Sequence, residues 1–331
     1  MRYILFFLFF SSFAFTQVSV SSQHVGGLKP IKKEDFSRFK NTKTIFILSE
    51  VFTHDEYKEV LSESWTLTPY ELVNKNDVNL ENYDLEKTSF ALLGGHIVNI
   101  QKSSGLSYNK YFTYVDFFMY DKEKKLKEIE DYKKKSDKRK KNYDLFAAKR
   151  ENFARLYLLP NNELLKSLFI GNISFDIYKK PSFFNYKLGF LKNYFQFIND
   201  KMTKNESYWF YQNSSTLEFK QLKSKTLYVP SYVITHLSGE DEDSKNAKLE
   251  DYFKDYEYKY ELMDDDVLNK KILEGEEFYY LRYARVNTER FLQVVNSKNG
   301  NIVYANYITG MSVSLKPKHI KELSKDISKA K

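Results

Sequence analysis

The stretch TKTIFILSEVFTHDEYKEVLSESW, residues 42–65, decides the fold class. Its apolar, β-branched run at 44–49 is typical of a buried strand. Thr53 then precedes a helical pattern, and Glu56 stands three residues further on, which is a capping box. A second strand is expected at 70–73. The stretch therefore predicts a parallel, right-handed βαβ unit.

The corner between this first strand and its helix lacks the features of a phosphate site. Phosphate-binding loops place glycines after the strand so that backbone N–H groups can approach the anion. Here Glu50, Val51 and Phe52 take that place, and an acid and two bulky side chains obstruct and repel a phosphate. Neither GxGxxG nor GxxxxGK occurs in the sequence. We therefore interpret the unit as architecture.

Further strand and helix patterns extend this unit to an α/β fold with a mixed β-sheet and helices packed on it. The Asn299-Gly300 pair is a strong hairpin signal near the C-terminus. No repeat of solenoid length and no coiled-coil heptad is visible. Strands are expected at 89–100, 111–120, 226–235, 278–286, 291–295 and 302–309, and helices at 153–168, 183–202, 265–273 and 319–329.

The N-terminus indicates export. Met1-Arg2-Tyr3, a short apolar run and small residues up to Thr16 form a secretory signal peptide over 1–16. The polar segment 17–40 reads as a linker, followed by a single α/β domain over 41–331. No cysteine occurs in the chain, and export without disulfides favours a bacterial protein, periplasmic or extracellular.

Charge is distributed unevenly along a chain of net charge +8. Residues 121–150 form a charged insertion with thirteen Lys or Arg against seven Asp or Glu, and the acidic segment 240–266 has twelve acids against four lysines. The basic segment is either a solvated helix or a contact for polyanions. No nucleic-acid motif accompanies it, and any membrane contact would be peripheral. The candidate contact residues are Lys133, Lys134, Lys135, Lys138, Arg139, Lys140 and Lys141.

The sequence contains no complete catalytic or metal-binding motif, so no catalytic, cofactor or metal residue is predicted. The five histidines show no HExxH or other metal spacing. His54 and His319 read as surface residues. His96 follows Gly94 and Gly95, and glycines allow a ligand to approach a strand, so these three are candidate ligand contacts. Paired carboxylates for glycoside cleavage remain open, because their pairing is spatial.

The C-terminal segment FLQVVNSKNGNIVYANYITGMS, residues 291–312, followed by a closing helix, resembles the end of small periplasmic α/β domains. These are the TolB N-terminal domain and the CsgG-like envelope proteins, in which a strand enters a D-x-x-T-G turn and returns. The segment 44–65 also looks like the first unit of such domains. The chain lacks the lipobox cysteine of the lipoprotein members, which puts membrane anchoring and pore formation in doubt. The resemblance implies an envelope interaction module without catalysis.

These patterns lead us to expect a non-enzymatic exported envelope protein that binds or scaffolds, with another envelope protein or a glycan as partner. One alternative is a secreted or periplasmic hydrolase of polysaccharide or cell wall, with two carboxylates in an aromatic-lined cleft. The other is a peripheral membrane or polyanion binder that uses the lysines of 133–141.

Overall fold

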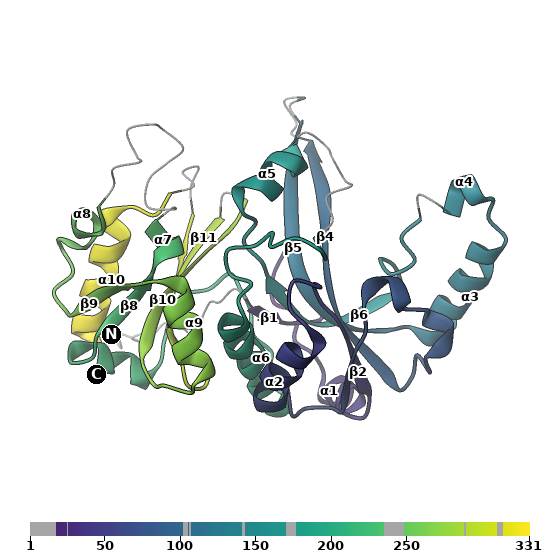
Figure 1. The fold of residues 1–331 in the computed structure, drawn as a ribbon, viewed down its shortest axis with the longest axis horizontal. Helices are drawn as coiled ribbons and strands as arrows, with labels where there is room; N and C mark the ends of the chain where they lie inside the picture. The colour runs from purple at the N-terminus through teal and green to yellow at the C-terminus, as the bar shows by residue number, and fades with distance from the viewer. Residues whose placement is uncertain are drawn as a thin grey trace, which may run out of the picture.

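The strands form two six-stranded mixed sheets, one from each half of the chain (Figure 1). The α/β class is therefore confirmed, while the strands divide between two sheets where the sequence suggested one. The predicted signal peptide at 1–16 lies outside the described residues. The computed structural model describes residues 18–24, 26–101, 105, 107–140, 143–169, 177–234, 248–287, 289–309 and 314–331.

Sheet 1 belongs to the first half of the chain. Its strands are β1 (Val18–Val20), β2 (Lys43–Ile47), β3 (Tyr70–Leu72), β4 (Thr88–Gln101), β5 (Ser107–Tyr120) and β6 (Arg150–Tyr157), in the order β1-β6-β5-β4-β2-β3. Strand β2 is parallel to β3 and β4, and the other neighbours are antiparallel. Helix α2 (His54–Ser64) joins β2 to β3 and begins with the Thr53 capping box. The predicted βαβ unit is confirmed.

Sheet 2 belongs to the second half of the chain. Its strands are β7 (Ser214–Ser215), β8 (Leu227–Pro230), β9 (Tyr260–Met263), β10 (Tyr279–Val286), β11 (Glu289–Asn296) and β12 (Ile302–Ile308), in the order β7-β12-β11-β10-β8-β9. Strands β11 and β12 form the predicted hairpin, with Gly300 in its turn at φ +71°. Helix α10 (Pro317–Lys329) follows. The expected C-terminal hairpin and helix are confirmed.

The two sheets have the same topology. Read across each sheet, β1 to β6 correspond to β7 to β12, and every neighbouring pair has the same relative direction. Each sheet also shifts register once at the same place, after Phe117 in β5 and after Val294 in β11. The edge strands β3 and β9 even share the tripeptide Tyr-Glu-Leu. We call residues 18–157 half 1 and residues 214–331 half 2, two copies of one fold.

Helix α6 (Leu188–Thr203) joins the two halves and contacts both sheets. On one side, the Phe195 ring lies 5.7 Å from the Phe46 ring of β2. On the other, the Phe190 ring stacks at 5.8 Å on Tyr280 of β10. Ten of the sixteen residues of α6 are buried, as its apolar residues around most of the helix predicted. One core cluster therefore extends through both halves.

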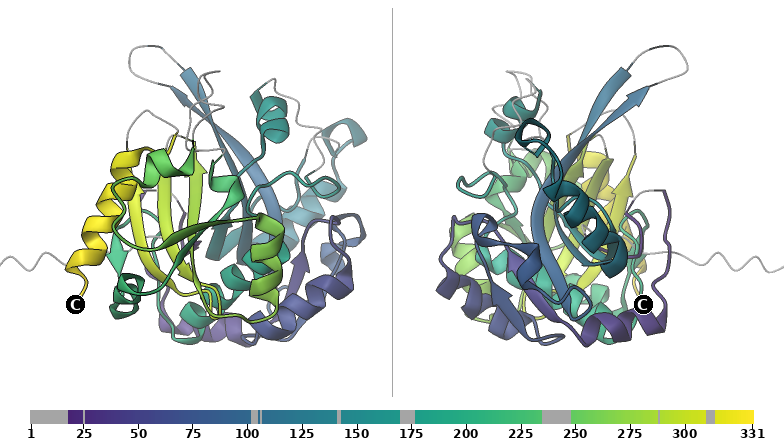
Figure 2. Two further views of the ribbon diagram at one scale, coloured as in Figure 1. Left: turned by 60° about the vertical axis from the view of Figure 1, so that its left-hand side comes forward. Right: turned by 90° about the vertical axis from the view of Figure 1, so that its right-hand side faces the viewer.

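The remaining helices cover the sheets or extend from them. In half 1, the β4–β5 hairpin projects beyond its neighbours, as Figure 2 shows. Helices α3 and α4 form an arm, at the right of Figure 1. The helices are α1 (Lys33–Lys40), α3 (Lys122–Lys133), α4 (Asp137–Lys140), α5 (Asn162–Phe169), α7 (Ser231–Ile234), α8 (Leu249–Phe253) and α9 (Asp265–Leu273), with 3-10 helices η1 (Lys75–Asp77), η2 (Leu80–Asn82) and η3 (Leu217–Lys223).

Three sequence-based assignments are corrected by the structure. The expected linker at 17–40 contains β1, which completes sheet 1, and α1, which buries Phe36 and Phe39. The expected helix at 153–168 is strand β6 followed by α5, because a strand buried on both faces is apolar at successive positions, as a buried helix is. The expected strand at 226–235 ends as β8 at Pro230, where α7 begins.

Candidate functional site

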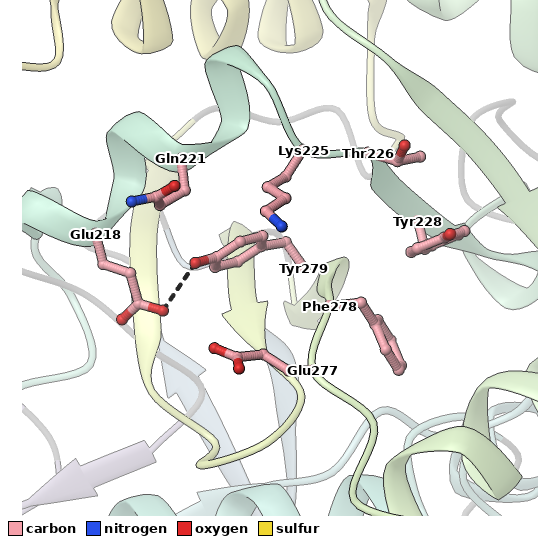
Figure 3. A pocket seen from close by; sticks show the side chains of 8 residues that line it. All are labelled: Glu218, Gln221, Lys225, Thr226, Tyr228, Glu277, Phe278 and Tyr279. Atoms are coloured by element: carbon pink, nitrogen blue, oxygen red, sulfur yellow. Dashed lines mark hydrogen bonds between the residues drawn. The ribbon is translucent and has the colours of Figure 1, made fainter.

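An open pocket of about 550 Å³ lies at the edge of sheet 2 where β8 and β10 begin (Figure 3). Helix η3 forms one wall, and it is fixed there because Phe219 and Leu222 are buried beneath it. The Phe219 ring stacks at 4.6 Å on Tyr304 of β12. The lining residues are Glu218, Gln221, Lys225, Thr226, Tyr228, Glu277, Phe278 and Tyr279.

Two carboxylates of this pocket lie close together. Asn296 Nδ2 donates to Glu218 Oε1 at 2.5 Å and lies 3.4 Å from Glu277 Oε1, so one amide joins the two acids. The Tyr279 hydroxyl also donates to Glu218 Oε1, at 2.9 Å (Figure 3). Lys298 Nζ lies 3.6 Å from Glu277. The carboxylates are thus held in place by groups of β10, β11 and the following turn.

The Glu218 carboxylate changes the chemistry of its neighbouring phenol. Burial, together with the hydrogen bond to Glu218, raises the pKa of Tyr279 above its ordinary value. Tyr279 is therefore a neutral donor at physiological pH. The pocket combines a fixed phenol, an amide and two carboxylates, and each carboxylate has further lone pairs that can accept hydrogen bonds.

Aromatic rings form the opposite wall of the pocket. Tyr228 and Phe278 are half-buried, with ring centroids 5.5 Å apart at an interplanar angle of 85°. Lys225 is exposed and extends over the pocket in Figure 3. Ring faces beside a few convergent polar groups are the usual components of a small-molecule site. Sequence reasoning missed this pocket, because Glu218, Glu277 and Asn296 come from three separate segments.

The predicted contacts Gly94, Gly95 and His96 lie in β4, in a different part of the molecule. His96 Nδ1 is 2.9 Å from the Tyr114 hydroxyl, and its ring stacks on Phe112 at 4.9 Å. Burial, and then the positive charge of Arg155, lowers the pKa of His96. A Cβ at Gly95 would lie 2.7 Å from the Phe112 carbonyl oxygen, so this glycine permits close strand pairing.

The other two histidines singled out by sequence differ in their surroundings. His54 is exposed, as expected, and its Nε2 is 3.0 Å from Asn74 Oδ1. His319 was expected at the surface but is buried, and its Nδ1 accepts a hydrogen bond from Lys316 N at the start of α10. Burial lowers the pKa of His319 to about 4. Its position is therefore structural.

The described basic candidates lie on the projecting arm of α3 and α4, at the other end of the molecule from sheet 2 (Figure 1). Lys133 pairs with Glu81 of η2, and Lys134 lies 3.9 Å from Asp131. Lys135 lies over the ring of Tyr143 at 5.1 Å, and Lys140 over that of Tyr132 at 5.9 Å. Lys138 and Arg139 are exposed. Lys141 lies outside the described residues.

The corner after β2 is filled by the protein's own polar groups. The Tyr57 hydroxyl donates to Ser49 O at 2.7 Å and lies 3.0 Å from the Tyr186 hydroxyl. Tyr186 in turn accepts from Ser49 N, and Ser49 Oγ donates to Tyr178 O at 2.7 Å. The Tyr178 carbonyl and the Tyr186 hydroxyl therefore occupy the place where a phosphate loop would hold its ligand.

Comparisons with known proteins do not identify the site. A scan against protein-family models and a search of curated proteins find no match to this chain. Within the described ranges, no helix is long and apolar enough to cross a membrane. The same part of the chain contains no group of three or more His, Asp or Glu side chains placed to hold a metal ion.

Proposed function

We propose that the protein is a non-enzymatic, exported protein of a bacterial envelope that binds a glycan in the pocket of sheet 2. The observation that carries this proposal is the pairing of Glu218 and Glu277 through Asn296, opposite the rings of Tyr228 and Phe278. Sugar hydroxyls need several fixed acceptors and donors, and the apolar face of a sugar ring packs on an aromatic ring. The pocket supplies both in a space of about 550 Å³.

The expected export and envelope location belong to the same proposal. They are supported by the N-terminal signal-peptide pattern and by the lack of cysteine. A protein-binding role is the other form of this function, since the projecting β4–β5 hairpin offers a surface separate from the pocket (Figure 2). Fractionation of the native host, with detection of the mature protein, tests the location.

A polysaccharide hydrolase is the second candidate, because two acids do meet in one aromatic-lined pocket. Retaining glycosidases hold their two carboxyl groups about 5 to 5.5 Å apart, one as acid and one as nucleophile. A general acid must present a proton to the substrate. Here Glu218 accepts from Tyr279 and Asn296, and Glu277 lies beside Lys298. These contacts favour binding over turnover.

One experiment separates the two candidates. Soluble fragments of peptidoglycan and of bacterial surface polysaccharides would be titrated against the mature protein by calorimetry, and the same mixtures assayed for newly released reducing ends. We expect binding without release. Glu277→Gln and Tyr228→Ala should each weaken binding about tenfold or more, whereas Glu274→Gln, an exposed acid outside the pocket, should not.

The two other outcomes contradict the proposal in different ways. Release of reducing ends that Glu277→Gln abolishes would establish the hydrolase. Fragment binding unaffected by both pocket substitutions, or no binding across the panel, would remove the pocket as a glycan site.

A further inference from the structure

Each half of the molecule contains a buried arginine on the same face of its central strands. In half 1, Arg155 of β6 donates from Nε and Nη2 to the Asp116 carboxylate of β5, at 2.5 and 2.8 Å. Arg150 adds a third contact to Asp116 at 3.1 Å. Asp116 is 1% exposed and Arg155 7%, so the buried Arg155 guanidinium has a carboxylate as its counter-charge inside the protein.

The position of Asp116 has a defined counterpart in half 2. Asp116 stands one residue before the register shift of β5, and Gln293 stands one residue before the equivalent shift of β11. Asp116 faces Leu92 of β4, and Gln293 faces Arg282 of β10. The duplicated fold therefore replaces a carboxylate with a neutral amide at this point and places the arginine on the other neighbouring strand.

Arg282 is left without a carboxylate. Its Nε donates to Gln293 Oε1 at 2.8 Å, and its guanidinium lies 4.3 Å from the ring centroid of Tyr194. Among the described residues, neither Nη1 nor Nη2 of Arg282 has a hydrogen-bond acceptor, and neither has Nε2 of Gln293. Arg282 is 1% exposed and is the largest fully buried side chain. Within the described ranges, three buried donor atoms of this pair therefore have no acceptor.

A buried guanidinium in this state is costly. Moving an unpaired charge into the interior costs several kcal/mol, and buried donors are nearly always paired. Stacking on Tyr194 offsets only part of this cost. The Tyr280 hydroxyl donates to Asn193 and also lies beside Arg282, but burial raises the pKa of Tyr280, so that phenol is neutral and supplies no counter-charge.

We propose that Arg282 and Gln293 bind a small monovalent inorganic anion, such as chloride, which supplies the negative charge that the Asp116 carboxylate supplies in half 1. The anion accepts from the two terminal guanidinium nitrogens and from the Gln293 amide. It neutralises a charge that half 1 neutralises with its own chain. The site is separate from the open pocket and does not depend on the function proposed for that pocket.

Chloride-dependent stability tests the proposal. The mature protein would be unfolded thermally and with urea in sodium chloride from about 1 to 300 mM, with sodium gluconate, whose anion is large and organic, holding ionic strength constant. Above the dissociation constant, each tenfold rise in chloride should raise the folding equilibrium constant about tenfold. Bromide should act like chloride, and a bromide-soaked crystal should show an anomalous peak beside Arg282.

Two variants assign any dependence to this site. Gln293→Asp supplies the carboxylate that half 1 already has, so the chloride dependence should disappear while the protein stays folded. Gln101→Asp, an exposed change on β4 with the same charge, should leave it intact. Three results would each overturn the proposal. They are a stability that does not change with chloride concentration, a chloride dependence that persists in Gln293→Asp, and a bromide-soaked crystal without a bromide at Arg282.

Discussion

The first residues of β4 and β10 differ in role between the two halves, since one half buries a polar network there and the other half has the pocket there. In half 1, Ser89 at the start of β4 hydrogen-bonds to the Thr42 and Thr44 hydroxyls at 2.7 and 2.8 Å, in a closed, buried network. In half 2 the equivalent residue is Tyr279, which pairs with Leu227 as Ser89 pairs with Thr44. Its larger side chain extends to Glu218 and lines the pocket.

The difference teaches that topology fixes positions and individual side chains decide their use. The same holds at the connection between the fifth and sixth strands of each sheet. In half 1 this connection contains the arm of α3 and α4, and in half 2 it is the tight turn at Gly300. Half 1 therefore offers an arm and a projecting hairpin, while half 2 offers the pocket.

The largest expected effect comes from breaking the charge balance of half 1. Asp116→Ala leaves Arg155 and Arg150 without their shared carboxylate, and we expect a loss of about 3 to 5 kcal/mol in the free energy of unfolding. The matched change in half 2, Gln293→Ala, removes one neutral partner and should cost about 1 kcal/mol. Urea unfolding measures both. Equal losses would show that the two positions are not distinguished by charge.

Acid should weaken both halves through buried histidines. Burial, and then Arg155, lowers the pKa of His24 in half 1 to about 3, and burial lowers that of His319 in half 2 to about 4. Because these values lie below the ordinary 6.5, the unfolded chain binds protons first. The contribution of the two neutral histidines to the free energy of unfolding is fully present above pH 6.5. It falls as the pH drops toward 4, by about 1.4 kcal/mol per pH unit for each histidine.

Asp116 extends the acid sensitivity of half 1. Although burial opposes its ionisation, the Arg155 guanidinium holds the pKa of Asp116 below its ordinary value, so its contribution is lost only below about pH 3.8. Urea unfolding at several pH values should show a reduced slope between pH 6.5 and 4 in His24→Gln. The exposed His54→Gln serves as control. An unchanged slope in His24→Gln would mean that His24 is not buried as a neutral group.

The turn that distinguishes half 2 can be tested by its glycine. A Cβ at Gly300 would lie 2.2 Å from the Asn193 carbonyl oxygen of α6, and its φ of +71° disfavours any side chain. Gly300→Ala should therefore cost about 3 kcal/mol or more. Gly275 has a similar φ of +77°, but a Cβ there would have no atom within 4 Å. Gly275→Ala should therefore lower the free energy of unfolding by only about 1 kcal/mol. Equal losses in the free energy of unfolding for the two variants would show that α6 shifts to accommodate the added Cβ.

The sequence predicted those features that depend on neighbouring residues. The capping box at Thr53, helix α9 and the hairpin at Asn299-Gly300 are each encoded within a few positions, and all are confirmed. The duplication was not visible, because identities such as the shared Tyr-Glu-Leu and the matched Tyr157 and Tyr307 are few, and most equivalent places differ, as Asp116 and Gln293 do. The pocket was missed for a related reason: its carboxylates lie 59 positions apart, at 218 and 277, and only the fold joins them.

The smallest effect on stability is expected from the arm, which half 2 lacks. Lys138 and Arg139 are exposed on α4 and Lys134 on the preceding turn. Replacing all three with glutamine should change the free energy of unfolding by less than about 0.5 kcal/mol. If the arm binds polyanions, the same variant should lose salt-sensitive binding to lipopolysaccharide or anionic vesicles, because each released counterion contributes to affinity.

A matched variant distinguishes local contact from net charge. Lys220, Lys223 and Lys225 form an exposed basic set around η3 in half 2, and replacing them with glutamine removes the same charge from the other half. If only the α4 variant loses binding in co-sedimentation at about 50 mM salt, the arm itself is the contact. If both variants lose it equally, the net charge of +8 attracts polyanions without a defined site, and the arm of half 1 has no binding role that its counterpart turn lacks.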